Sequence, residues 1–183
     1  MEYVIVMAVI TGIMVLFGLL LFRSGLTHIE TGEKRAGRQG EQVASQIIKE
    51  ILNDEDILLT NVKTAFTGNT AELDNVIINN HGIFIIEVKN YTGMLAGNGN
   101  DKEWLKSISS GAFFQKSVKN PIWQVKRQVS ILSDYLKQYG IKSKIEGYAF
   151  LLERNSPVES PFILSSQKDI DSVIYSEIDP RRR

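Results

Sequence analysis

The sequence predicts a mixed α/β fold, in which a central mixed β-sheet is flanked by helices and preceded by one N-terminal transmembrane helix. Two long segments have apolar residues at helical spacing, and several short runs between them have the composition of strands. An uncharged apolar run stands near the N-terminus. Beyond that run, a chain of 183 residues has room for one compact domain with one sizeable core.

The composition excludes several functional classes. The chain has no Cys and two His residues, so disulfide scaffolds, cysteine-ligated metal sites, thiol nucleophiles and sites that need several histidines are ruled out. The formal net charge is zero, but the charges are segregated. Residues 102–144 contain nine Lys or Arg residues and two acidic residues, whereas the segments on either side are acidic overall. A basic segment inside an acidic chain needs a physical explanation.

Residues 3–22 are expected to span a membrane. As a helix this run is ~30 Å long, the thickness of the hydrocarbon core of a bilayer, and its thirteen Val, Ile, Leu and Phe residues favour insertion by roughly 4 to 8 kcal/mol. The alternative, a cleaved signal peptide, would have Lys or Arg before the run and a small-residue cleavage site after it, but Glu2 precedes it and Arg23 follows. Because positive side chains lie C-terminal to the run, we expect a single-pass cell-membrane protein with its N-terminus outside and its soluble domain in the cytoplasm. Residues 1–23 are assigned to the anchor and 24–32 to a linker.

The first half of the soluble part is expected to contain one helix and three strands. Small and apolar residues recur at helical intervals over residues 33–52, which predicts a helix. Turns rich in Gly and Asn then separate three strand-like runs. These predicted strands cover residues 57–64, 71–79 and 82–90. Residues 90–100 are expected to form a short strand and a loop.

The second half is expected to begin with an edge strand over residues 104–108 and an irregular segment over 109–119. Asn120 and Pro121 then predict the start of a helix that Gly140 ends. Two late strands and a short helix are expected at 145–152, 162–165 and 168–178. This order of elements is typical of a mixed sheet with helices on both faces. Residues 33–140 are assigned to the core of the domain, which residues 141–183 complete.

The second and third strands carry the most informative side chains. If their connecting loop has two or four residues, Asp74 lies opposite Glu87, and strand alternation puts Glu87 and Lys89 on that same face. Two facing carboxylates are unfavourable unless a proton or cation lies between them, and oxygen ligands suit Mg²⁺ or Mn²⁺. An ammonium group beside them would orient or activate water for attack on a phosphodiester.

The same pattern has a simpler interpretation. An exposed strand end, with Lys89 paired to either carboxylate, would show the same spacing. A three-residue loop would shift the register by one and separate Asp74 from Glu87.

Glu41 adds a candidate third acidic group. Helical geometry places it on the apolar face of the first helix, and a carboxylate that faces a core needs a partner. Gly37 and Gly40 are expected to let this helix approach the sheet closely. Glu41 would then bind a metal directly or through water, or else it lies on the margin of the apolar stripe.

In their order along the chain, these residues resemble the nuclease-related domain (NERD) family, which is assigned to the PD-(D/E)xK, restriction-endonuclease-like superfamily. The matching motifs are Gly37-x-x-Gly40-Glu41, Glu72-Leu73-Asp74, the block from Gly82 to Gly93, Trp104, and Asn120-Pro121-x-x-Gln124. The resemblance covers residues 33–140. It implies a restriction-endonuclease-like fold and a divalent-metal nuclease site. It carries over Glu41, Asp74, Glu87 and Lys89 as catalytic or metal-binding positions and Gln124 as an accessory site residue. Asn75 is a departure, since family members are expected to have His there.

The basic segment provides candidate nucleic-acid contacts. These are Lys116, Lys119, Lys126 and Arg127, with Phe113, Phe114 and Trp123 between them. Together they would follow a phosphate backbone and stack on bases. The alternatives are solvated lysines over core aromatics, or contact with anionic lipid near the bilayer. Gln124 would hydrogen-bond a site carboxylate or a phosphate, or else be solvated.

The sequence therefore predicts a membrane-anchored nuclease that depends on Mg²⁺ or Mn²⁺ and has low sequence specificity. DNA is the expected substrate ahead of RNA. The alternative is a non-catalytic module of the same fold that binds nucleic acid or a protein partner at the membrane.

Overall fold

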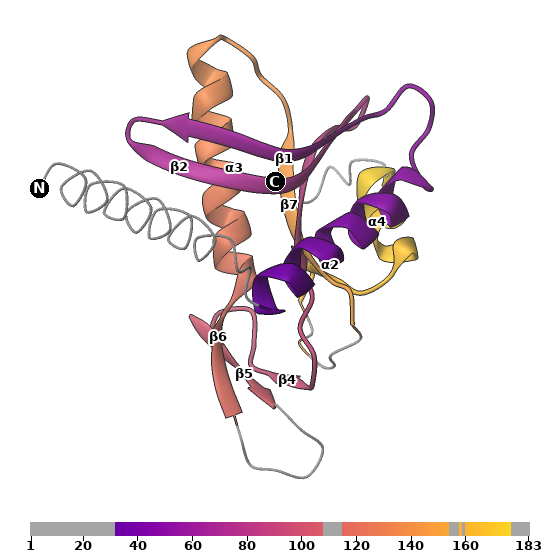
Figure 1. Cartoon of the computed structure of the whole chain (residues 1–183). Coiled ribbons are helices and arrows are strands. Elements are labelled where there is room, and N and C mark those ends of the chain that lie inside the picture. The colour runs from indigo at the N-terminus through magenta and orange to yellow at the C-terminus, as the bar shows by residue number, and fades with distance from the viewer. Residues whose placement is uncertain (1–31, 108–114, 154–157, 159, 177–183) are drawn as a thin grey trace, which may run out of the picture. The chain divides into compact units, whose positions relative to one another are not determined.

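The computed structural model describes residues 32–107, 115–153, 158 and 160–176 (Figure 1). The chain divides into two compact units, residues 1–35 and 36–183, and every element below belongs to the second unit apart from the first residues of α2. The predicted membrane span, residues 3–22, lies outside the described residues. Within the described ranges, no helix is long and apolar enough to cross a membrane.

A five-stranded mixed sheet forms the centre of the fold, in the order β1-β2-β3-β7-β8. Its strands are β1 (Ile57–Phe66), β2 (Asn69–Asn79), β3 (Gly82–Lys89), β7 (Ile145–Leu151) and β8 (Ile163–Leu164). The first three strands are antiparallel, whereas β7 is parallel to both β3 and β8. The pairs Ile78–Ile83 and Asn75–Ile86 give the β2–β3 hairpin the register expected from the sequence.

Helices cover both faces of this sheet (Figure 1). Helices α2 (Gly32–Lys49) and α4 (Gln167–Ile174) pack on one face, and α3 (Pro121–Gln138) packs on the other. The first face carries Ile77, Phe84, Ile86 and Val88, and the second carries Val76, Ile83 and Ile85. The apolar side chains of β2 and β3 thus alternate between the two faces, and the predicted mixed sheet between helices is confirmed.

A second, three-stranded antiparallel sheet was not predicted. It consists of β4 (Leu95–Ala96), β5 (Glu103–Ser107) and β6 (Gln115–Lys119). The segment expected to be irregular thus includes a strand, β6. Its only apolar residue is Val118, so it lacks a strand-like hydrophobic pattern, and its conformation follows from pairing with β5. There Val118 lies opposite Trp104, which is fully buried.

Helix α3 begins where the sequence predicts. Asn120 accepts a hydrogen bond from the Ile122 amide through Oδ1 at 2.9 Å, and Pro121 occupies the first helical position. The Asn120 Nδ2 also donates to the carbonyl oxygens of Asp101 at 2.7 Å and Gly99 at 3.2 Å. The buried Asn120 therefore ties the loop before β5 to the start of α3, which bears Gln124.

Candidate active site

Asp74 lies in β2 at a point where strand pairing is interrupted. Among the described strand pairs, β2 is joined to β1 on both sides of Asp74 but not at Asp74 itself, where the opposite residue, Asn61, has a positive φ of 53°. Pairing with β3 stops at Asn75. Instead, the Asp74 side chain accepts a hydrogen bond from the Val88 amide through Oδ2 at 2.8 Å. The carboxylate therefore takes the place of a backbone acceptor where the two strands separate.

The alternation of side chains also changes at Asp74. Leu73 packs in the cluster on the α3 face, whereas Asn75, two residues later, accepts a hydrogen bond from Ser45 on α2 at 2.7 Å. In a regular strand these two side chains would share a face. The regular alternation that the sequence prediction assumed is therefore interrupted at Asp74, and Asp74 and Glu87 are not a pair in the β2–β3 ladder, which ends at Asn75 and Ile86.

An open cavity of about 430 Å³ lies between α2 and the edge of the sheet. Its lining includes Asp74, Glu41, Ser45, Arg38, Lys49 and Asn61. Glu41 is half-buried and lies one helical turn before Ser45, whose hydroxyl also donates to the Glu41 carbonyl at 2.9 Å. The structure thus brings Glu41 and Asp74 to one cavity.

The close approach of α2 depends on one of the two glycines that the sequence singled out. A Cβ atom on Gly40 would lie 2.7 Å from the Asn90 Cβ and 3.0 Å from the Leu152 Cδ1, whereas a Cβ atom on Gly37 would meet nothing within 4 Å. The Asn90 Nδ2 also donates to the Ala36 carbonyl at 3.0 Å. The expectation was therefore right for Gly40 and wrong for Gly37, which faces open space.

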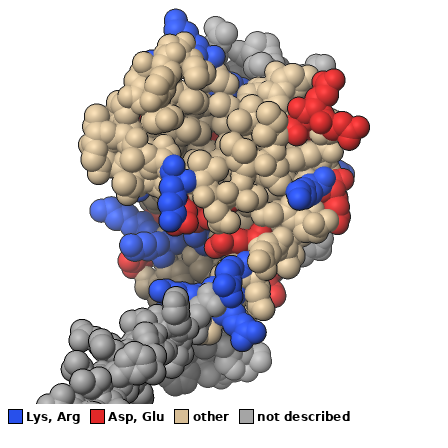
Figure 2. Space-filling model, turned by 45° about the horizontal axis from the view of Figure 1, so that its top comes forward, with Lys and Arg blue, Asp and Glu red and all other residues tan. Residues whose placement is uncertain are grey.

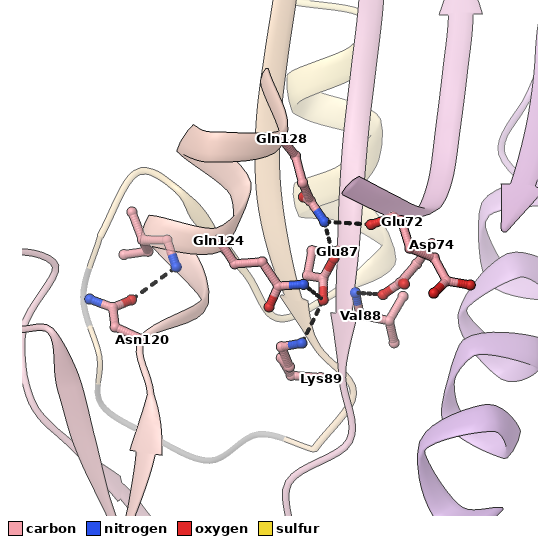
Figure 3. A network of polar contacts seen from close by, with 9 residues as sticks. Glu72, Asp74, Glu87, Val88, Lys89, Asn120, Gln124 and Gln128 are labelled. Atoms are coloured by element: carbon pink, nitrogen blue, oxygen red, sulfur yellow. Dashed lines mark hydrogen bonds and ion pairs between the residues drawn. The ribbon is translucent and has the colours of Figure 1, made fainter. Parts of the chain in front are cut away.

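Glu87 lies at the centre of a network of hydrogen bonds (Figure 3). Its side chain is almost fully buried. Oε1 accepts from the Lys89 Nζ at 2.5 Å and from the Gln124 Nε2 at 2.6 Å, and Oε2 accepts from the Gln128 Nε2 at 2.6 Å. The predicted neighbours Glu87, Lys89 and Gln124 are therefore together in the structure.

Gln128 is a member of this network that the sequence did not reveal. Its Nε2 also donates to the Glu72 carbonyl at 2.9 Å, so one amide joins α3 to both β2 and β3. The Gln128 side chain is 2% exposed, and its Oε1 receives no hydrogen bond from the described residues. The available signal was its spacing, because Gln128 lies four residues after Gln124 and shares its side of the helix.

Asp74 and Lys89 both have pKa values above their ordinary values, for different reasons. Burial, then the nearby Glu87 carboxylate and more weakly Glu41, raise the pKa of Asp74 to about 7, against the opposing effects of the Val88 amide and Lys89. Burial lowers the pKa of Lys89, but its contact with Glu87 outweighs this effect, so the pKa lies above its ordinary value. Lys89 is therefore a cation at neutral pH and cannot act as a general base.

Asp74 and Glu87 are the carboxylates that would hold a divalent ion here. Among the described residues, no three His, Cys, Asp or Glu side chains gather closely enough to hold a metal, so the expected convergence of three acids is not found. Glu87 is held toward α3, whereas Glu41 lies on α2 across the sheet. The Asp74 Oδ1 receives no hydrogen bond from the described residues, and the Glu87 Oε2 accepts one. Two carboxylates of this kind suit Mg²⁺, which keeps several waters and is often completed by substrate phosphates.

The predicted nucleic-acid contacts lie on two elements. Lys116 and Lys119 are on β6, where they lie opposite Lys106 and Glu103, and Lys126 and Arg127 are exposed on α3. Phe113 and Phe114 lie outside the described residues. On the face shown in Figure 2, blue and red side chains lie close together in the lower part, and further charged groups lie at the top and at the upper right.

The site thus combines a half-buried carboxylate in the middle of β2 with a buried carboxylate and a lysine at the end of β3, an arrangement compatible with a nuclease-related domain. The comparison with protein families agrees, because the model described as "Nuclease-related domain" matches residues 36–152, and the chain belongs to this family. The match confirms the resemblance seen in the sequence and extends it through β7.

One curated relative is an uncharacterized protein of Bacillus anthracis, which is 28% identical over 108 residues, or 57% of this chain and 49% of the relative. The chain thus spans about half the length of that relative. No solved structure matches the chain significantly.

Proposed function

We propose that the chain is a divalent-metal-dependent nuclease that hydrolyses phosphodiester bonds with low sequence specificity, with DNA as its first expected substrate. One observation carries the proposal: the half-buried Asp74 carboxylate accepts from the Val88 amide, next in the chain to the buried Glu87, whose carboxylate is paired with the Lys89 ammonium. Burial and then the neighbouring Glu87 carboxylate raise the pKa of Asp74 to about 7. A bound Mg²⁺ or Mn²⁺ would supply a Lewis acid and lower the pKa of a bound water.

Each residue then has a defined role. Asp74 is the principal ligand, Glu87 is the second ligand, and Glu41 acts from across the cavity through water. Gln124 and Gln128 fix the position of the Glu87 carboxylate. Lys89 places its positive charge beside the scissile phosphate, where negative charge develops during the reaction. Lys116, Lys119, Lys126 and Arg127 hold the phosphate backbone.

The test is a cleavage assay on the full chain in detergent. DNA and RNA are incubated with Mg²⁺, with Mn²⁺ or with chelator, beside Asp74→Asn and Lys89→Ala. We expect metal-dependent cleavage, and a loss of roughly 10²- to 10³-fold in either variant, the size found when a group that stabilises transition-state charge is removed. Lys137→Ala, which removes an exposed lysine from α3, should retain full activity. Cleavage that persists in chelator or in both site variants would refute the proposal.

A non-catalytic module is the second candidate function. The observation that favours it is the set of three donors on Glu87, which compensates this carboxylate without any metal. The module would bind nucleic acid or a protein partner at the membrane. Binding without cleavage in either metal, with Asp74→Asn binding as tightly as the wild type, would support this function over the nuclease.

We also propose that residues 3–22 anchor the chain in the cell membrane, with the N-terminus outside and the nuclease-related domain in the cytoplasm. The support is the length and apolar composition of this run and the positive residues that follow it. The basic residues would then also contact anionic lipid near the bilayer.

A further inference from the structure

Trp123 presents an aromatic ring to solvent in a fixed orientation. It is the third residue of α3, and 50% of its surface is exposed. Its Nε1 donates to the Asp101 carbonyl at 3.1 Å. The Lys126 Nζ lies 5.7 Å from the Trp123 ring centroid and 5.0 Å from that of Phe162, which is also partly exposed. An exposed indole thus lies near a cation that also lies near a second exposed ring.

This surface is adjacent to the candidate active site. Gln124 follows Trp123 directly and donates to Glu87. At about 100° per residue, Arg127 lies roughly 40° from Trp123 and roughly 60° from Gln124 around the helix axis. Around the helix axis, the exposed Arg127 therefore lies between Trp123 and Gln124, which contacts Glu87. Lys126 lies on the other side of Trp123.

We propose that Trp123 is a stacking platform for an unpaired base, and that the nucleic acid bound here is single-stranded. The location of the platform beside a scissile phosphate rests on the proposed nuclease function. In a duplex, both faces of each base are covered by neighbouring bases, whereas a single strand leaves them free to stack on an aromatic side chain. Lys126 and Arg127 supply the positive charge that the phosphates on either side of such a base require.

The arrangement favours nucleic acid over a lipid surface. The Trp123 Nε1 is bound to the protein backbone, so the polar end of the indole is not available for the headgroup region, where membrane-bound Trp places it. Lys126 lies near the ring, and helical spacing directs Arg127 toward the side of the network that holds the buried Glu87. This geometry matches a strand that runs from the platform toward Glu87.

The two tryptophans of the chain make the proposal measurable. Trp104 is fully buried, so a change of emission on ligand addition reports Trp123. The full chain in a zwitterionic detergent with chelator is titrated with a thymidine homo-oligonucleotide or with a blunt duplex of the same length. We expect the single strand to change the emission and to bind more tightly than the duplex.

Variants then separate stacking from charge, with binding followed by the anisotropy of a labelled oligonucleotide. Trp123→Ala should weaken single-strand binding by about 5- to 150-fold, the loss expected for one stacked base, and should change duplex binding little. Trp123→Phe should retain most of the affinity. Tyr139→Ala, which removes a 63% exposed aromatic at the other end of α3, should change neither.

The failure of this inference is distinct from the failure of the nuclease proposal, because binding is measured in chelator. Loss of single-strand binding in Trp123→Ala supports the inference even if no metal allows cleavage. Equal binding of single strand and duplex, unaffected by Trp123→Ala, overturns it even if the chain cleaves DNA. An emission change that follows anionic lipid added to the micelles, with none from the oligonucleotide, also overturns it.

Discussion

The environment of Asp74 is unfavourable for a charged carboxylate. Its pKa of about 7 in the folded chain exceeds the value of about 3.9 in an unfolded chain, so the folded state binds the proton more tightly. Its contribution to stability is therefore complete below about pH 4 and is lost as the pH rises through about 7. In chelator, we expect the free energy of unfolding to fall over this range in the wild type, and to fall less in Asp74→Asn.

The measurement is urea unfolding followed by tryptophan emission at a series of pH values. Asp134→Asn removes an exposed carboxylate on α3 and should retain the wild-type pH dependence. Identical slopes for the wild type and Asp74→Asn would show that the Asp74 carboxyl titrates as a solvated group.

Gln128 and Gln124 donate to the same carboxylate from different environments. Gln128→Leu removes the donor to the buried Glu87 Oε2 and to the partly buried Glu72 carbonyl. The unpaired Glu87 Oε2 should cost about 1–3 kcal/mol of unfolding free energy. Gln124→Leu should cost less, because Gln124 is exposed and the Glu87 Oε1 keeps Lys89. Chemical denaturation of both variants tests this order, and an equal loss in the two would contradict it.

At the scale of elements, the position of α2 against the sheet depends on Gly40. Gly40→Ala would place its Cβ 2.7 Å from the Asn90 Cβ, so α2 must move, at a cost of about 1–3 kcal/mol. Gly37→Ala is the matched control, because it lies in the same helix with open space around it and should stabilise the chain by about 0.5–1 kcal/mol. Thermal unfolding distinguishes the two, and a stabilising Gly40→Ala would refute the close approach.

The elements show what could be predicted from the sequence and why. The hairpin of β2 and β3 and the start of α3 were predicted because local signals define them: alternating apolar residues, an Asn-rich turn, and the Asn120–Pro121 pair. Strand β6 was missed because its conformation follows from pairing with β5 rather than from its own composition. The sequence correctly predicted that Glu87, Lys89 and Gln124 lie together. Gln128 was overlooked, because no sequence motif of the site includes it.

At the scale of the molecule, the parallel pairing of β3 with β7 joins residues more than fifty positions apart, and no turn signal predicts it. This pairing places the Glu87 strand between β2 and β7, with α3 over one face and α2 over the other. Glu87 therefore lies toward α3, whereas Glu41 lies on α2 at the opposite face. The order of the motifs along the chain does not show which face of the sheet each helix covers, so a single site for all three acids could not be tested from the sequence. The nearness of Asp74 and Glu87 could be predicted, because both lie in one hairpin.

The predicted membrane anchor concerns the whole chain. Because the chain has no Cys, single introduced thiols can test it. Glu2→Cys and Lys142→Cys each introduce one thiol, before the apolar run and in the nuclease-related domain. With the N-terminus outside, a membrane-impermeant maleimide should label Glu2→Cys in intact cells and Lys142→Cys only after permeabilisation, because the positive residues beyond the run retain that side in the cytoplasm. The reverse pattern would place the domain outside. Release of the chain from membranes by alkaline carbonate would exclude a spanning helix, because an inserted apolar helix of this length does not dissociate without detergent.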